Sequence, residues 1–172
     1  LAGGIQPWKG GVFVASTPDI WYLKDTDGDG KADLREKVFT GFGIENQQGM
    51  VNSLIMGLDH RIYGSSSVNG GEIRPARDPA APAGSVRGRD FRFDPVTLRF
   101  EPQAGTRQFG MAFDDWGNRF LCSQSEPAVH AVLPLQYLER NPHFVPPASL
   151  HRTTPLPTPI HRISPVERWR HL

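Results

Sequence analysis

The residues best suited to chemistry are the acidic side chains of residues 25–36. Oxygen donors at positions 1, 3, 5, 7, 9 and 12 of a twelve-residue loop, with glycine at position 6, bind Ca²⁺. The predicted ligands are Asp25, Asp27, Asp29, the backbone carbonyl of Lys31, Asp33 and Glu36. The alternative is a solvated acidic turn, because Asp-Gly repeats also occur at hairpin tips. We favour calcium, since aspartates so close together repel one another without a cation.

The segments on either side of this loop decide what kind of calcium site it is. Residues 19–24 and 36–40 are short, rich in aromatic or β-branched residues, and followed by Gly41 and Gly43. This composition is typical of strands, whereas an EF-hand needs a helix on each side. We therefore predict a structural calcium loop that connects two strands, and not a helical calcium sensor.

Composition favours a turn-rich β-protein. The 172 residues include 18 Gly and 16 Pro, and 38% of the chain is hydrophobic. The net charge is +1, so no general attraction to nucleic acid is expected. No run approaches the roughly 18 apolar residues of a membrane span, so none is predicted. The sequence opens at Leu1 without a signal peptide, and we expect it to be cut from a longer precursor.

The cysteine and histidine content points to neither a redox nor a zinc site. Cys122 is the single cysteine, which rules out an internal disulfide and a Cys-x-x-Cys-His haem attachment motif. It lies in an apolar strand pattern that predicts a buried, inert thiol. The six histidines show no zinc-ligand spacing.

The chain contains an internal repeat. Residues 53–65 align with residues 110–122 without a gap, and both read as a strand, a turn and a second strand. Tyr63 matches Phe120, and Phe13 holds the equivalent place near the N-terminus, so these aromatic residues are 50 and 57 residues apart. A four-stranded propeller blade takes roughly 40–50 residues. The fold class predicted is therefore all-β, a β-propeller with about three blades in this chain.

Three regions follow from the repeat. Residues 1–135 are predicted to form the partial β-propeller, with an exposed loop at residues 66–88 that is rich in Gly, Pro and Ser. Residues 136–160 are predicted to be a proline-rich connection, and residues 161–172 the start of a further, truncated blade. Because three blades cannot close a ring, we expect the isolated chain to be poorly soluble or to self-associate.

Polar side chains at equivalent places in two repeats are the candidates for a ligand site. In a propeller, the innermost strands and the loops before them meet at the central channel. The candidate cofactor-binding residues are Gln47, Asn52, Arg107 and Gln108, with Asn46 and Gln48 beside them. Arginine and amide groups can hold a carboxylate or a sugar by hydrogen bonds. The alternative is that these amides cap strand ends and satisfy loop backbone.

Five motifs, in order along the chain, resemble one known family. They are residues 19–33, 51–64, 87–95, 110–117 and 162–167. Together they resemble the membrane-bound dehydrogenase (PVC-type haem-binding) β-propellers of planctomycetes and verrucomicrobia. Those proteins are similar to the soluble quinoprotein glucose and sorbosone dehydrogenases, and the resemblance covers nearly the whole chain.

The resemblance implies a six-bladed propeller exported to the periplasm. It would oxidise a sugar-like alcohol or aldehyde with pyrroloquinoline quinone (PQQ) and pass the electrons to a cytochrome-type acceptor, with haem c in a downstream domain. Residues 45–51 contain no histidine where such enzymes carry their base, so no catalytic residue is assigned. The alternative is a non-catalytic, calcium-stabilised propeller that binds carbohydrate or a protein partner.

Overall fold

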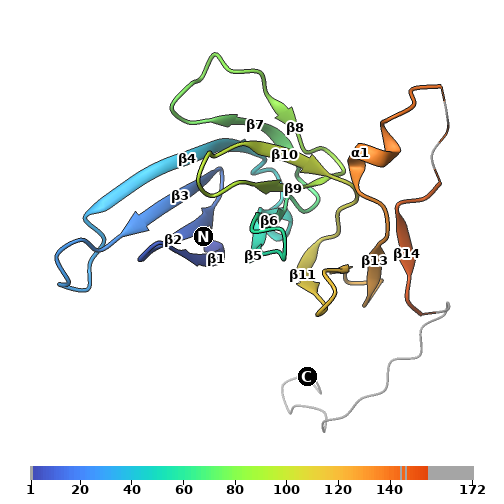
Figure 1. Ribbon diagram of the computed structural model, residues 1–172, viewed down its shortest axis with the longest axis horizontal. Helices are drawn as coiled ribbons and strands as arrows, with labels where there is room; N and C mark the ends of the chain where they lie inside the picture. Colours follow the sequence, from blue (N-terminus) through green and yellow to red (C-terminus); the bar gives the residue numbers. More distant parts are fainter. Residues whose placement is uncertain (1, 144, 146, 155–172) are drawn as a thin grey trace, which may run out of the picture.

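The protein folds as three antiparallel sheets that follow one another across the molecule, as the computed structural model shows (Figure 1). The structure describes residues 2–143, 145 and 147–154. The all-β prediction is confirmed. The described residues contain three sheets of six, four and four strands and no closed propeller. Within them, no helix has the length and hydropathy to cross a membrane.

Each sheet contains a run of four antiparallel strands. The first consists of β1 (Ala2–Trp8), β2 (Gly11–Ser16), β3 (Asp19–Lys24) and β4 (Leu34–Phe42), extended by β7 (Gly71–Pro75) and β8 (Gly84–Ser85). The second consists of β5 (Asn52–Met56), β6 (Ile62–Ser65), β9 (Asp90–Phe93) and β10 (Phe100–Gln103). The third consists of β11 (Phe109–Phe113), β12 (Arg119–Cys122), β13 (Val129–Ala131) and β14 (Leu150–Arg152). Two short helices, η1 (Gln47–Gly49) and α1 (Leu135–Leu138), lie in connections.

The main hydrophobic core lies between the first and second sheets. Phe13 on β2 and Phe39 on β4 both pack edge-on against Phe93 on β9, with ring centroids 5.1 and 5.2 Å apart. All three side chains are buried, because alternate residues of each strand point toward the neighbouring sheet. Aromatic pairs in this geometry add to the stability gained by burying their area.

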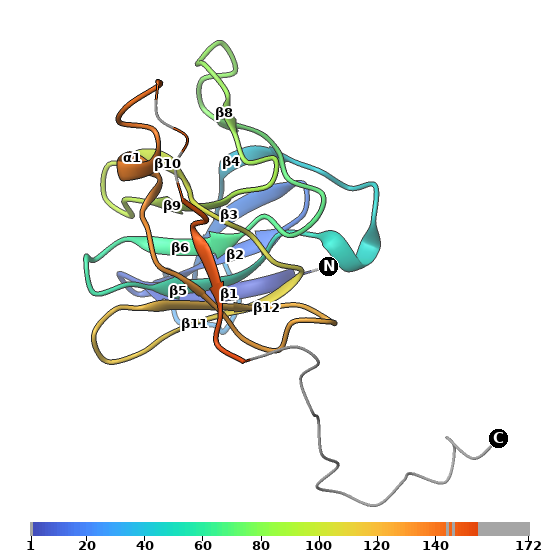
Figure 2. The ribbon, with the colours of Figure 1, turned by 90° about the vertical axis from the view of Figure 1, so that its right-hand side faces the viewer.

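The first strands of the three sheets lie side by side. Strand β1 contacts β5, and β5 contacts β11 (Figure 2). Gly3 and Gly4 permit the first of these approaches, since a Cβ at Gly3 would lie 2.2 Å from the carbonyl oxygen of Val51. A side chain there would force the two sheets apart.

The strands predicted around the calcium loop and in the internal repeat are confirmed. Strands β3 and β4 flank the loop, and the two aligned segments form the hairpins β5–β6 and β11–β12. Phe13, Tyr63 and Phe120 each lie on the second strand of a sheet. Cys122, predicted to be buried, is partly exposed, and its thiol lies 3.2 Å from the carbonyl oxygen of Phe109.

The prediction of an exposed loop over residues 66–88 holds for only part of this stretch: residues 76–83 are irregular, and residues 77–80 are exposed. Residues 71–75 and 84–85 instead form β7 and β8, which extend the first sheet because β7 pairs with the free edge of β4. Ile73 and Val86 are buried, and so are Ser66 and Ser67. Pairing with a distant strand satisfies the backbone groups, which outweighs the turn-forming composition.

The stretch predicted as a proline-rich connection contains two elements. Helix α1 begins at Leu135, and β14 pairs with β13 as an edge strand. Strand β14 lies where residues 148–154 contain no proline, so its backbone can join the ladder. The truncated blade predicted at residues 161–172 lies outside the described residues.

Candidate functional site

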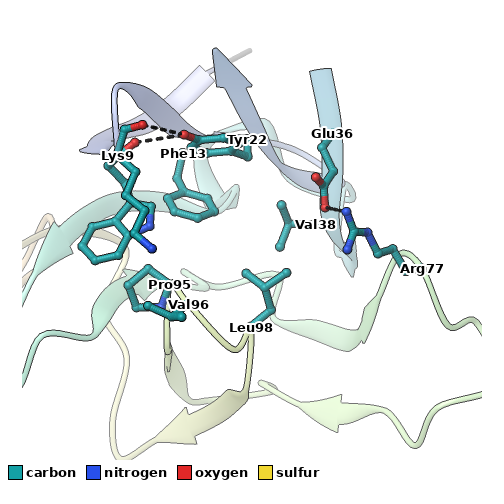
Figure 3. Close-up of a pocket in the computed structure, with 10 residues that line it drawn as sticks. Lys9, Phe13, Tyr22, Glu36, Val38, Arg77, Pro95, Val96 and Leu98 are labelled. Carbon is teal, nitrogen blue, oxygen red and sulfur yellow. Dashed lines mark hydrogen bonds and ion pairs between the residues drawn. The ribbon is translucent and has the colours of Figure 1, made fainter. Parts of the chain in front are cut away.

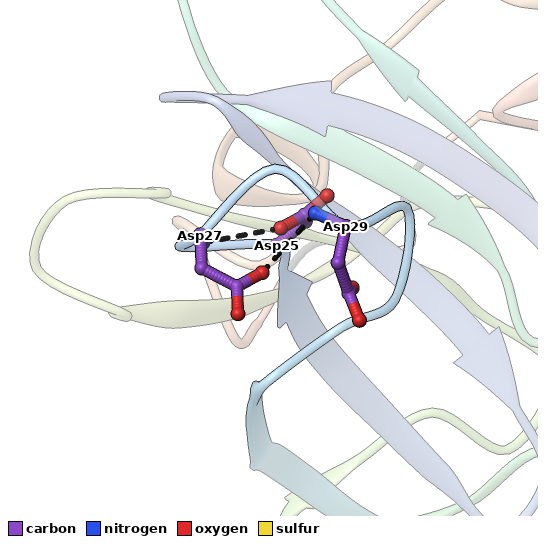
Figure 4. A group of neighbouring side chains, drawn as sticks. All are labelled: Asp25, Asp27 and Asp29. Atoms are coloured by element: carbon purple, nitrogen blue, oxygen red, sulfur yellow. Dashed lines mark hydrogen bonds between the residues drawn. The ribbon is translucent and has the colours of Figure 1, made fainter.

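The loop between β3 and β4 carries an exposed cluster of three carboxylates. One carboxylate oxygen from each of Asp25, Asp27 and Asp29 lies within 4.8 Å of the other two (Figure 4). The alternation of Asp with other residues places these side chains together, because the chain turns tightly at glycines. Gly28 and Gly30 have φ of 85° and 84°, a region that side chains disfavour.

Backbone amides hold Asp25 at the centre of the loop. Its Oδ1 accepts hydrogen bonds from the amides of Gly28 (2.7 Å) and Asp27 (3.2 Å), and its Oδ2 from that of Gly30 (2.9 Å). These bonds, led by that from Gly28, lower the pKa of Asp25. The carboxylate is therefore kept in the charged form that a cation requires.

The other predicted ligands have different surroundings. Asp33 accepts hydrogen bonds from the Thr26 amide (2.9 Å) and hydroxyl (3.0 Å), and the amide bond is the main cause of its lowered pKa. The Lys31 ammonium lies 3.5 Å from Asp29. Glu36 lies on β4 and forms a 2.7 Å ion pair with Arg77. The structure thus brings three of the six predicted ligands together, and the roles of Lys31, Asp33 and Glu36 stay predictions.

The donor set of this loop fits a calcium ion. All donors in the cluster are carboxylate oxygens, the ligands that hard cations prefer. The loop is exposed to solvent, so water can supply the remaining oxygens of a coordination shell of about six to eight. Asp25, Asp27 and Asp29 would hold the ion, which would remove the mutual repulsion of their charges.

Two of the four predicted cofactor-binding residues line one cavity. Gln47, at the start of η1, and Asn52, at the start of β5, face a cavity with a volume of about 380 Å³. This cavity, which we call the inner-strand cavity, lies where β1, β5 and β11 begin, and Phe109 of β11 also lines it. The remaining lining residues are Ala2, Gly3, Gln48, Met50, Val51 and Ser53.

Asn52 connects two of the inner strands. Its side-chain amide donates to the carbonyl oxygens of Met50 (3.0 Å) and Gln108 (3.3 Å), and its Oδ1 accepts from the Ser53 hydroxyl (2.7 Å). Gln108 therefore takes part through its backbone. The alternative reading, in which amides satisfy loop backbone, accounts for the contacts of Asn52 and Gln108 but leaves the Gln47 side chain at the cavity.

Arg107 is not among the residues that line this cavity. Its guanidinium lies 2.6 Å from the Glu126 carboxylate, which also pairs with Arg152 at 2.6 Å. The pKa of Glu126 is lowered, mainly by the hydrogen bond from Arg152. The charge of Arg107 is therefore compensated within the third sheet and its loops.

A buried ionic network, which the sequence did not predict, lies between the second and third sheets. Asp90 on β9 is fully buried and pairs with Arg119 on β12 at 3.0 Å. Ser65 donates to Asp90 (3.1 Å), and Arg119 also donates to the carbonyl oxygen of Ala104. The internal repeat held the signal, since Arg119 aligns with the apolar Ile62. A charge at a position that is buried in the equivalent repeat predicts a buried partner.

The three sheets and the aspartate cluster define an all-β protein with a candidate cation-binding loop. Residues 1–172 match the family described as a domain of unknown function (DUF7133), and the chain belongs to this family. No curated protein and no solved structure matches the chain.

Proposed function

We propose that this chain forms three consecutive blades of a calcium-braced β-propeller. The observation that carries the proposal is the arrangement of the sheets. Each sheet contains a run of four antiparallel strands that follow chain order, except that β7 and β8 of the first sheet lie between β6 and β9 in the sequence. The first strands β1, β5 and β11 lie side by side. In a propeller the first strand of each blade lines the central axis.

The face of the first sheet that points away from the second sheet supports the proposal of a further blade on that side. Phe13 and Ala15 on β2 point toward the second sheet and are buried. Val14 points the other way, next to its cross-strand partners Ile5 and Trp21. Apolar residues on a half-buried sheet face are covered in folded proteins by a further layer. A neighbouring blade is the layer that a propeller provides.

The calcium loop acts in this proposal as a brace. It connects β3 and β4, which form the outer half of the first four-stranded run. An ion that binds Asp25, Asp27 and Asp29 of the folded loop, but not of the unfolded chain, stabilises the fold. The role is structural, because the loop is a strand connection and contributes nothing to the lining of the inner-strand cavity.

The inner-strand cavity is proposed to bind a sugar-like molecule within an exported quinoprotein-like dehydrogenase. Gln47 offers its side-chain amide to the hydroxyls of a sugar-like alcohol. The Asn52 Oδ1 and the Ser53 hydroxyl oxygen can still accept a hydrogen bond, although the Asn52 amide and the Ser53 hydroxyl already donate within the protein. PQQ, which accepts the two electrons of such an oxidation, carries carboxylates. The described lining is uncharged and does not by itself fit them, so we derive no step through this cofactor.

A second candidate is a non-catalytic propeller that binds carbohydrate or a protein partner. The uncharged lining favours it, because removal of a hydroxyl proton requires a base within hydrogen-bond reach. Gln47 and Asn52 can orient a ligand, but an amide does not accept the proton. In the enzyme, the base would come from outside the described lining, as would the cytochrome-type acceptor.

Dye-linked dehydrogenase activity of the full-length protein separates the two candidates. The protein is loaded with calcium and PQQ and supplied with sugars and alcohols. Turnover that requires PQQ, and that falls in Gln47→Ala and Asn52→Ala, supports the dehydrogenase. Sugar binding without turnover supports the binding propeller. If the protein shows no sugar binding and no turnover, the assignment of this cavity is contradicted. Gln136→Ala, on α1 away from the cavity, is the matched control.

A further inference from the structure

A second cavity lies between the first and second sheets, at the opposite end of β1 from the inner-strand cavity (Figure 3). Its volume is about 250 Å³, which is below the roughly 300–1,000 Å³ of pockets for drug-sized ligands. Phe13 and Val38 are buried residues of its wall, and Leu98 lies across from them. The cavity therefore has room for one small ligand with an apolar body.

The charged groups of the lining leave one uncompensated cation. Glu36 and Arg77 neutralise each other at 2.7 Å. Lys9 also lines the cavity, and its ammonium lies 5.6 Å from the centre of the Trp8 ring. Within the described part of the chain, no carboxylate lies within ion-pair distance of Lys9. The lining thus carries a net charge of +1, from two cations and one anion.

The Tyr22 hydroxyl does not contribute a free polar group. It donates to the carbonyl oxygens of Trp8 (3.1 Å) and Lys9 (3.4 Å). Tyr22 therefore fixes the β1–β2 turn and presents the side of its ring to the cavity, next to Phe13 at 5.1 Å between centroids. Lys9 is held by its backbone at the rim.

Two lining residues have backbone conformations that their side chains disfavour. These two residues are Lys9 and Leu98. Lys9 is the first residue of the β1–β2 turn, in which Lys9 and Gly10 have φ of 43° and 75°. A turn with two positive φ values favours Asn, Asp or Gly at its first position. Leu98, in the β9–β10 turn, has φ of 59°. Residues held in this region concentrate at ligand sites. The conflict indicates a use for these side chains, and both line the same cavity.

We propose that this cavity binds a small carboxylate with an apolar ring as its body. The ring would lie against Phe13, Tyr22 and Leu98, and the carboxylate would pair with Lys9. Such a ligand removes apolar area from water and supplies the single negative charge that the lining lacks. The site is separate from the inner-strand cavity and from the proposed function of the chain.

Benzoate is the probe that tests this proposal, with benzamide and benzylamine as neutral and cationic matches. In an NMR titration we expect benzoate to shift the Trp8 indole resonance with a dissociation constant of about 1 mM, a value appropriate to a ligand of this size. Benzamide should bind about fivefold more weakly, because it lacks the ion pair. Benzylamine should bind more weakly still.

Two variants assign the effect to this cavity. Lys9→Gln should reduce benzoate affinity to that of benzamide, whereas Arg140→Gln removes one positive charge from an exposed position after α1 and should leave affinity unchanged. Val96→Phe fills the cavity mouth from a position that is 64% exposed, so it should fold normally and abolish binding. The proposal is overturned if benzoate does not bind, if benzoate and benzamide bind equally, or if Lys9→Gln has no effect. None of these results bears on the inner-strand cavity.

Discussion

Replacement of Arg119 by methionine should destabilise the protein more than any change to a surface ion pair. The guanidinium is nearly buried and pairs at 3.0 Å with a carboxylate that is fully buried. Arg119→Met leaves Asp90 without its counter-charge and the carbonyl oxygen of Ala104 without its donor. Loss of one partner of a buried ion pair costs about 3–5 kcal/mol. Methionine fills much of the same volume, so most of the cost is electrostatic.

Urea unfolding at pH 8, where Asp90 is ionised, measures this cost. Arg99→Met is the matched control, since Arg99 pairs at 2.9 Å with Glu101 but is 71% exposed, and its loss should cost less than about 1 kcal/mol. The double variant Asp90→Asn, Arg119→Met should recover part of the stability, because it removes the unpaired charge. A cost below about 1 kcal/mol for Arg119→Met, or no recovery in the double variant, would refute the reasoning.

Two further predictions concern contacts between neighbouring sheets. Burial is the main cause that raises the pKa of Asp90 from 3.8 to about 6, so the folded state binds this proton more tightly than the unfolded state. The contribution of Asp90 to the free energy of unfolding should therefore fall as pH rises from about 4 to about 6. Asp90→Asn should remove this dependence of the free energy of unfolding on pH, and an unchanged dependence contradicts the assignment. Gly4→Ala should lower the free energy of unfolding in urea by about 1–3 kcal/mol, because its Cβ would lie 2.6 Å from the Leu54 amide nitrogen. Gly84→Ala should cost less, because a Cβ at Gly84 has more room. Equal costs would contradict the close approach of β1 and β5.

The sequence predicts the aspartate cluster between β3 and β4 well because everything that forms it is local. The aspartates, the glycines and the ends of β3 and β4 lie within one short stretch, so spacing alone determines which side chains meet. The same holds for the hairpins β5–β6 and β11–β12, whose strands are adjacent in the chain. Alignment of the two repeats adds the equivalence of Tyr63 and Phe120.

Contacts between distant segments are what the sequence does not predict. Strand β7 was missed because its partner is the edge of β4, and the Gly- and Pro-rich composition around it is typical of loops. Glu36 occupies position 12 of the calcium pattern, but its ion pair is with Arg77, from the connection after β7. Arg107 was grouped with Gln108 by sequence position, although Glu126 holds its guanidinium elsewhere.

Thermal unfolding in calcium and in chelator tests the central claim most directly. With the ion present, the wild-type protein should melt at a higher temperature than in chelator, since the ligand binds only the folded state. Asp25→Ala should lose this difference, while Asp115→Ala, which removes an exposed carboxylate from the β11–β12 turn, should keep it. A melting temperature that is the same in both buffers, or equal calcium-dependent stabilisation of wild type and Asp25→Ala, would contradict the calcium brace.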